Sequence, residues 1–102
     1  MENKTETISG QRAELFPLGQ IVATPGAIEA LKQAGEYPSA LLMRHVHGDW
    51  GEVDKHDWNE NNESLRTGER IFSAYTLQNG ERLWIITEAD RSVTTILLPE
   101  DY

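Results

Sequence analysis

The chain has 102 residues, no cysteine and a formal charge of −8 at pH 7, with 38% hydrophobic and 25% charged residues. This length suits a single domain with one modest core, and the lack of cysteine excludes disulfides, thiolate zinc sites and cysteine nucleophiles. The excess negative charge argues against nucleic acid as a partner, because affinity for nucleic acid depends on Lys and Arg side chains that neutralise phosphates.

The sequence gives no sign of membrane insertion or export. No apolar run approaches the ~20 residues of a membrane-spanning helix, and residues 1–15 lack the apolar core of a signal peptide. We therefore expect a cytoplasmic protein without a membrane partner.

Residues 1–14 are polar and follow neither a strand period nor a helix period, which predicts a flexible N-terminal tail. A single domain is expected over residues 15–102. It begins with an apolar stretch, residues 16–22, that is interrupted by Pro17 and Gly19. This pattern is typical of a short edge strand or an extended lead-in.

Helices are predicted over three segments that follow. The first covers residues 24–35, with a threonine as N-cap, a proline in the first helical position and a glycine at its end. The second begins at Pro38, because the residue before a proline avoids the helical region, and it ends near residue 48. The third extends from Asp54 as N-cap to about residue 67, and its apolar face is thin.

Negative charge is concentrated around this third helix. Residues 49–63 contain six acidic side chains and one lysine. The simplest interpretation is a solvated acidic helix. The alternative is a surface that faces a partner, either by imitating nucleic acid or by binding a basic protein.

The last third of the chain, residues 70–99, predicts three antiparallel strands joined by two tight turns. Asn79-Gly80 is a strong hairpin signal, because both central residues of a type I′ turn need a positive φ angle. A two-residue loop at this position would place Tyr75 opposite Trp84.

The second turn, at Asp90-Arg91, would place Ile85 opposite Ile96. Both faces of the sheet would then be apolar. One face would carry Ile71, Tyr75, Leu77, Trp84, Ile86, Val93 and Leu97, and the other Phe72, Ala74, Leu83, Ile85, Ile96 and Leu98.

The expected fold class is therefore α+β, with two or three helices packed on a three- to four-stranded antiparallel sheet that ends in a C-terminal β-meander. An antiparallel sheet in a monomer usually leaves one face polar. We therefore expect helices on one face and either the N-terminal segment or a second subunit on the other, which would make a homodimer through the sheet.

His45, His47 and Asp49 have the spacing of some hydrolytic metal sites. On a helix, however, residues two apart point about 200° away from each other. We therefore expect no metal and no cofactor, with His45 at the edge of the core and hydrogen-bonded to backbone, and His47 exposed. Glycines 48 and 51 bracket Asp49 and Trp50, which predicts a tight loop. These two residues would either stabilise the loop internally or form a binding site for a partner.

Polar residues gather at the second turn, between residues 87 and 95. The structural interpretation is that Arg91 pairs with Glu88 or Asp90 and stiffens the turn, and the binding interpretation makes Asp90 and Arg91 contact residues. There is also a catalytic interpretation, because the chain resembles small ribonuclease toxins in the order of its helices and strands. It would use His45 or His47 as general acid/base, with Arg70 and Arg91 stabilising the charge of a phosphodiester in its transition state.

Several segments together resemble a family of bacterial proteins of about this length that are found on plasmids and integrated mobile elements. The segments are residues 15–27, 44–45, 48–51, 83–92 and 95–102. Members of this family are labelled plasmid-related or uncharacterised, and sometimes type I restriction endonuclease subunit M. The chain lacks an S-adenosylmethionine-binding glycine loop and an Asn/Asp-Pro-Pro-Tyr motif, so we expect no methyltransferase activity.

The sequence thus predicts a small acidic cytoplasmic protein of bacterial mobile elements. Its expected function is that of a non-catalytic protein-binding or accessory module, which engages its partner through the Trp50 loop or the acidic helix. Antirestriction by imitation of DNA is one concrete version. The alternative is a small ribonuclease-like or toxin-like enzyme that uses histidine and arginine.

Overall fold

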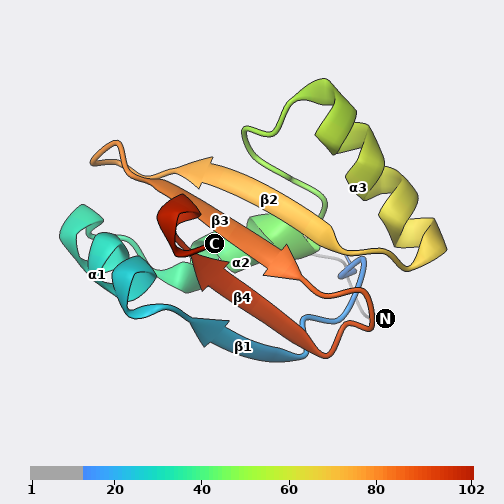
Figure 1. Cartoon of the computed structure of the whole chain (residues 1–102), viewed down its shortest axis with the longest axis horizontal. Helices are drawn as coiled ribbons and strands as arrows, with labels where there is room; N and C mark the ends of the chain where they lie inside the picture. The colour runs from blue at the N-terminus through green and yellow to red at the C-terminus, as the bar shows by residue number, and fades with distance from the viewer. Residues whose placement is uncertain (1–12) are drawn as a thin grey trace, which may run out of the picture.

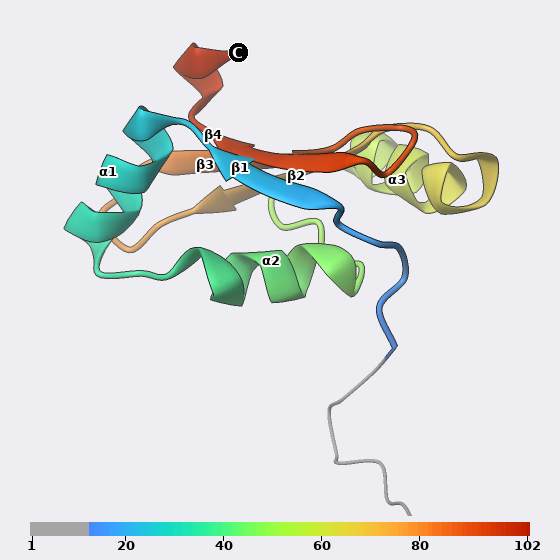
Figure 2. The same cartoon turned by 90° about the horizontal axis from the view of Figure 1, so that it is seen from below.

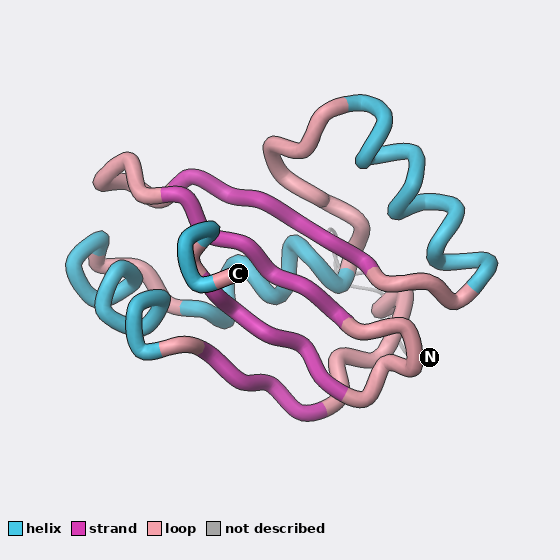
Figure 3. The backbone as a smooth tube through the Cα atoms, in the orientation of Figure 1, coloured by secondary structure: helices cyan, strands magenta, loops and turns pink. Residues whose placement is uncertain are grey.

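The computed structural model of the chain describes residues 13–102, so nearly all of the expected tail lies outside the described residues. This part of the chain forms three α-helices, a short 3-10 helix and a four-stranded sheet, and Figures 1 and 3 show their arrangement. The elements in chain order are β1 (Gln20–Ala23), α1 (Pro25–Ala34), α2 (Pro38–Val46), α3 (Lys55–Thr67), β2 (Ile71–Thr76), β3 (Arg82–Thr87), β4 (Val93–Leu97) and the 3-10 helix η1 (Pro99–Asp101).

The sheet has the strand order β1-β4-β3-β2. The pairs β2–β3 and β3–β4 are antiparallel, as expected for the meander, but β1 runs parallel to β4. The expectation of a wholly antiparallel sheet was therefore wrong. A parallel neighbour is possible because the chain passes through α1, α2 and α3 before the meander begins, which gives it the long connection that parallel strands need.

The three helices begin where predicted, although α2 ends at Val46 and not near residue 48. Capping contacts explain the bounds of α1 and α3. The side chains of Thr24 and Asp54 accept hydrogen bonds from backbone N–H groups three residues later, at 3.1 and 2.8 Å. Gly35 and Gly68 follow the first and third helices with left-handed φ angles of 70° and 84°. Pro38 occupies the first position of α2, as predicted.

The first hairpin differs from the prediction by one residue. The Leu77 N–H donates to the Glu81 carbonyl at 2.8 Å, so the loop comprises residues 78–80 and not the Asn-Gly pair alone. Gly80 has a φ angle of 89°, which fits a type I turn that is followed by a left-handed residue.

This change moves side chains to the opposite face of the sheet. Tyr75 pairs with Leu83, and the predicted Tyr75–Trp84 pair does not form. The predicted pairing of Ile85 with Ile96 across the second turn is confirmed. A shift of one residue has this effect because side chains alternate between faces along a strand.

Figure 2 shows α1 and α2 on one side of the sheet and η1 on the other. The side chains on what we call the helical face of the sheet are Ile71, Ser73, Tyr75, Leu77, Leu83, Ile85, Thr87, Thr94, Ile96 and Leu98. The distal face carries Phe72, Ala74, Thr76, Arg82, Trp84, Ile86, Val93, Thr95 and Leu97.

The C-terminal segment covers part of the distal face. The Tyr102 ring packs edge-on against Trp84 with ring centroids 5.8 Å apart, and Trp84 meets Phe72 at 5.0 Å. Ile86 and Leu97 are at most 6% exposed. Both faces therefore contain buried apolar side chains, although the two sets differ from those predicted.

The outer edge of β2 is covered by the chain itself. The Asn61 side chain on α3 donates to the Phe72 carbonyl at 2.6 Å and accepts from the Phe72 N–H at 3.1 Å. The Ala74 N–H donates to the Trp50 carbonyl at 3.1 Å, and the Ala74 carbonyl accepts from the Glu52 N–H at 2.7 Å. These contacts hold α3 beside β2 (Figure 1) and occupy hydrogen-bonding groups that an edge strand would otherwise expose.

Candidate functional site

His45 lies at the centre of a buried chain of polar side chains. It is fully buried, with Nδ1 2.6 Å from Ser73 Oγ and Nε2 2.9 Å from Thr87 Oγ1. Thr87 Oγ1 is 2.7 Å from Thr94 Oγ1, which in turn lies 2.7 Å from the Leu18 carbonyl. The partners of His45 are therefore side-chain hydroxyls and not the backbone groups that were expected.

The Leu18 carbonyl at the end of this hydrogen-bond network determines the direction of every hydrogen bond in the network. A carbonyl oxygen only accepts, so Thr94 donates its single hydroxyl proton to Leu18. Thr94 must then accept from Thr87, and Thr87 in turn accepts from Nε2–H of His45. His45 Nδ1 is left as the acceptor for the Ser73 hydroxyl. His45 is thus a neutral imidazole with its proton on Nε2.

Burial lowers the pKa of His45 from 6.5 to about 3, and the nearby positive charge of Arg91 acts in the same direction. His47 Nδ1 donates to the Met43 carbonyl at 2.7 Å. In residues 13–102, no three His, Asp or Glu side chains are grouped as metal ligands. Both imidazoles therefore take part in local hydrogen bonds, and His45 is closed to solvent.

Asp49 and Trp50 stabilise their own loop. Asp49 forms an ion pair with Arg44 at 2.7 Å, accepts from the Gly51 N–H at 3.1 Å and has a lowered pKa, chiefly because of the Arg44 hydrogen bond. Trp50 is fully buried, and its indole N–H donates to Asn62 at 3.1 Å. Of the two roles left open for this loop, the structure supports internal stabilisation, because the Trp50 ring has no exposed surface.

Arg91 connects the second turn to the end of α3. Its guanidinium donates to the carbonyls of Glu69, Glu88 and Ser64 at 2.7, 3.1 and 3.0 Å, and it lies 5.6 Å from the centre of the Phe16 ring. Cations are favoured at the carbonyl end of a helix. The turn is stiffened by Arg91, as the structural interpretation proposed, but through carbonyls and not through a carboxylate.

Two other candidates at this end of the sheet are also engaged locally. Asp90 accepts from the hydroxyl and the N–H of Ser92 at 2.6 and 3.0 Å, and these contacts lower its pKa. Arg70 donates to the Tyr102 hydroxyl at 2.9 Å and forms an ion pair with Glu88 at 3.2 Å. Arg70 and Arg91 are thus both engaged in contacts within the protein.

A surface groove with acidic walls lies between α3 and the sheet. Its volume is about 540 Å³. It is lined by His56, Asp57, Glu60, Asn61, Ser64, Glu69, Arg70 and Phe72. We call it the acidic groove.

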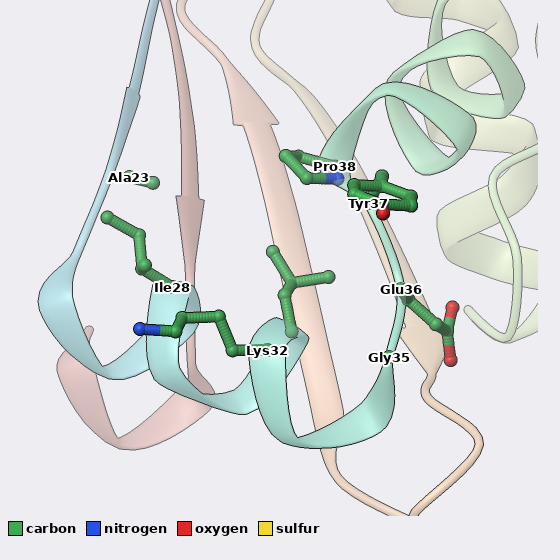
Figure 4. Close-up of a pocket in the computed structure, with 8 residues that line it drawn as sticks. Ala23, Ile28, Lys32, Gly35, Glu36, Tyr37 and Pro38 are labelled. Carbon is green, nitrogen blue, oxygen red and sulfur yellow. The ribbon is translucent and has the colours of Figure 1, made fainter.

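A second groove, of about 420 Å³, lies between β1, α1 and the start of α2 (Figure 4). Its lining is mainly apolar: Ala23, Ile28, Leu31, Lys32, Gly35, Glu36, Tyr37 and Pro38. Figure 4 shows Ala23 on the strand side and Tyr37 and Pro38 on the opposite side, with Ile28 and Lys32 projecting from α1. We call it the apolar groove.

The strand beside the apolar groove is at the open edge of the sheet. Gln20 and Thr24 direct their N–H groups to β4, so the backbone groups of Ile21 and Ala23 point outward, because the direction alternates along a strand. The side chains of Ile21 and Val22 are 47% and 38% exposed. Each groove is lined by one short stretch of the chain, residues 23–38 or residues 56–72. The sequence pointed to the acidic helix as a candidate surface but to neither groove, because a local pattern does not show how a helix packs beside a strand.

Three comparisons, with protein-family models, with curated proteins and with solved structures, found no match for this chain. Across residues 13–102, no helix has the length and apolar character needed to cross a membrane.

Proposed function

We propose that this chain is a non-catalytic protein-binding module whose site is the acidic groove, and that its partner presents a basic segment. One observation supports this most strongly: carboxylates from α3 and from the α3–β2 connection line a single surface groove with an aromatic ring beside them. The Trp50 loop was the other expected contact surface, and the burial of the Trp50 side chain leaves α3 as the better-supported one.

The charges in the groove favour a cationic ligand. Asp57, Glu60 and Glu69 contribute carboxylates, whereas the positive charge of Arg70 is paired with Glu88. The aliphatic stem of a lysine or arginine can pack against an aromatic ring while its charged end meets a carboxylate. Phe72 provides such a ring in this groove.

The groove is also held in shape before any partner arrives. Asn61 fixes α3 to β2 through both backbone groups of Phe72, and Arg91 fixes the last turn of α3 through the Ser64 carbonyl. A site that needs little ordering loses less conformational entropy when it binds its partner. This favours recognition through a preformed surface.

The resemblance to plasmid-borne proteins adds support for an accessory role on a mobile element. Antirestriction by imitation of DNA is a narrower version with weaker support, because Asp49 and Asp54 are used in local contacts and Glu63 is paired with Arg66. The ribonuclease alternative gains no support at His45, because both of its ring nitrogens are bonded inside the core.

The test is a titration of fluorescent lysine- and arginine-rich peptides with the wild type and the Asp57→Asn/Glu60→Gln double variant. We expect the double variant to bind about three- to tenfold more weakly, because two carboxylate charges of the groove are lost. Glu29→Gln/Glu81→Gln is the matched control, because it changes the net charge equally at exposed positions outside the groove. If the two double variants weaken binding equally, the effect comes from net charge and the groove is not the site.

A further inference from the structure

The two edges of the sheet differ in how far other parts of the protein cover them. The outer edge of β2 is covered by Asn61 and by the segment around Trp50, whereas no described residue pairs with the outer edge of β1. Edge strands of monomers are usually protected by charge, proline or a bulge. The sequence of β1, Gln-Ile-Val-Ala, contains neither a charge nor a proline.

We propose that β1 pairs antiparallel with β1 of a second copy of this chain and joins two four-stranded sheets into one. The resulting dimer has twofold symmetry, in which the same patch of each copy meets the other. This proposal concerns the edge of β1 and does not depend on the function proposed for the acidic groove.

Backbone geometry selects the register of the pairing. The outward groups of the strand belong to Ile21 and Ala23, because Gln20 and Thr24 direct theirs to β4. If the twofold axis passes beside Val22, Ile21 of each copy lies opposite Ala23 of the other and both N–H···O bonds form in each pair. A register centred on Ile21 would instead need Gly19, whose φ angle of 67° takes it out of the extended conformation.

The same register brings an exposed apolar side chain to the apolar groove. Ile21 and Ala23 point to the helical face of the sheet, since their partners on β4 are Thr94 and Ile96. Ile21 of the second copy therefore lies opposite Ala23, which lines the groove (Figure 4). Ile28 in the same groove is 49% exposed. The strand thus provides both the protruding side chain and part of the surface that receives it.

On the distal face, the two Val22 side chains meet at the twofold axis. They form a pair without direct hydrogen bonds, in which Cα atoms are about 4.5 Å apart. That separation lies within the range of about 4.4–6.8 Å that a disulfide spans. The chain has no cysteine, so a single introduced cysteine reports on this contact alone.

The first experiment oxidises the full-length Val22→Cys variant and follows the disulfide-linked dimer on a non-reducing gel. We expect its formation to be at least about tenfold faster than for Met43→Cys, because the twofold axis raises the effective concentration of the thiols. Met43 is a suitable control because it is 53% exposed on α2 and belongs neither to β1 nor to the lining of the apolar groove. Equal rates for the two variants would overturn the proposed register.

The second experiment measures the dimer dissociation constant by sedimentation equilibrium. Ile21→Lys introduces a charge at the centre of the contact and should raise the constant at least about tenfold, whereas Met43→Lys should leave it unchanged. Circular dichroism checks that each variant is folded. A wild-type chain that is monomeric at all concentrations would overturn the proposal, whatever peptide binding by the acidic groove shows.

Discussion

At the scale of single residues, His45 shows how a backbone carbonyl can determine the protonation of a side chain that it does not touch. The Leu18 carbonyl directs the proton of Thr94, and the effect passes through Thr87 to the imidazole. Both ring nitrogens of His45 and the hydroxyls of Ser73, Thr87 and Thr94 all have hydrogen-bond partners in this network. Such satisfied networks stabilise one arrangement of a core, because any rearrangement leaves a buried polar group unpaired.

This network predicts a loss of stability in acid. The pKa of His45 is 6.5 when unfolded and about 3 when folded. Between these values the unfolded chain binds a proton that the folded chain excludes, so the free energy of unfolding falls as the pH is lowered. The fall is at most about 1.4 kcal/mol per pH unit from this residue, and the contribution of His45 is fully retained above pH 6.5. Urea denaturation at several pH values measures it.

The control is His45→Gln, which keeps a donor and an acceptor but does not titrate. Both proteins also contain carboxylates with lowered pKa, such as Asp49 and Asp101, which reduce stability only in more acidic solution. The difference between the two proteins therefore isolates the imidazole. Parallel pH profiles from pH 7 to pH 4 would show that His45 becomes protonated without unfolding.

The sequence predicted some residue roles and not others, and the difference is physical. Thr24 and Asp54 act through contacts three residues away, so a local pattern was sufficient to find them. The sequence did not decide between a structural role and a binding role for Asp49 and Trp50, because a short sequence pattern does not show how deeply a side chain is buried. His45 was expected at the edge of the core with backbone partners, but it is fully buried and its hydroxyl partners come from β2 and β3, which a local pattern does not show.

At the scale of elements, the helices were easier to predict than the sheet. The first and third helices begin and end at capping residues that are visible in the sequence, and a proline marks the start of the second. Strand pairing depends instead on the loop length and on distant partners. The Asn-Gly pair at residues 79–80 is compatible with loops of two or three residues, and these two choices put opposite faces of β2 together with β3. The parallel pairing of β1 with β4 spans most of the chain and has no local signal.

The role of Asn61 was not predicted from the sequence. Asn61 lies between two apolar residues of the α3 face, and its position in a helix did not reveal that it replaces a neighbouring strand for Phe72. An asparagine in the apolar face of a helix is nevertheless a usable signal, because a buried amide needs hydrogen-bond partners.

Replacing Asn61 by alanine should therefore loosen α3 from β2. We expect a loss of about 1–3 kcal/mol in the free energy of unfolding, because the Phe72 backbone groups lose their partner. Amide hydrogen exchange at Phe72 should become faster. Asn59→Ala is the matched control, since Asn59 is exposed on the same helix. Unchanged exchange at Phe72 in Asn61→Ala would show that another group takes the place of the amide.

At the scale of the whole molecule, the two proposed surfaces lie at opposite edges of the sheet. The dimer contact uses β1, and the acidic groove lies beside α3 and β2 at the other edge (Figure 1). A dimer through β1 would therefore carry its two acidic grooves at the two ends of one continuous sheet. Such an arrangement binds a partner with two basic segments more tightly than either groove does alone, if the partner spans the distance.

Salt should change the two contacts in opposite directions. Each copy has a net charge of −8, so association of two copies is opposed by repulsion that salt screens. The β1 strands themselves are uncharged, so the dimer dissociation constant should fall as sodium chloride is raised from 50 to about 500 mM. Binding of a basic peptide to the acidic groove should weaken over the same range, because its attraction is electrostatic. Sedimentation equilibrium and peptide titration on the same samples measure both trends. A dimer that dissociates with added salt would contradict an uncharged strand contact, and peptide binding that is insensitive to salt would contradict the acidic groove.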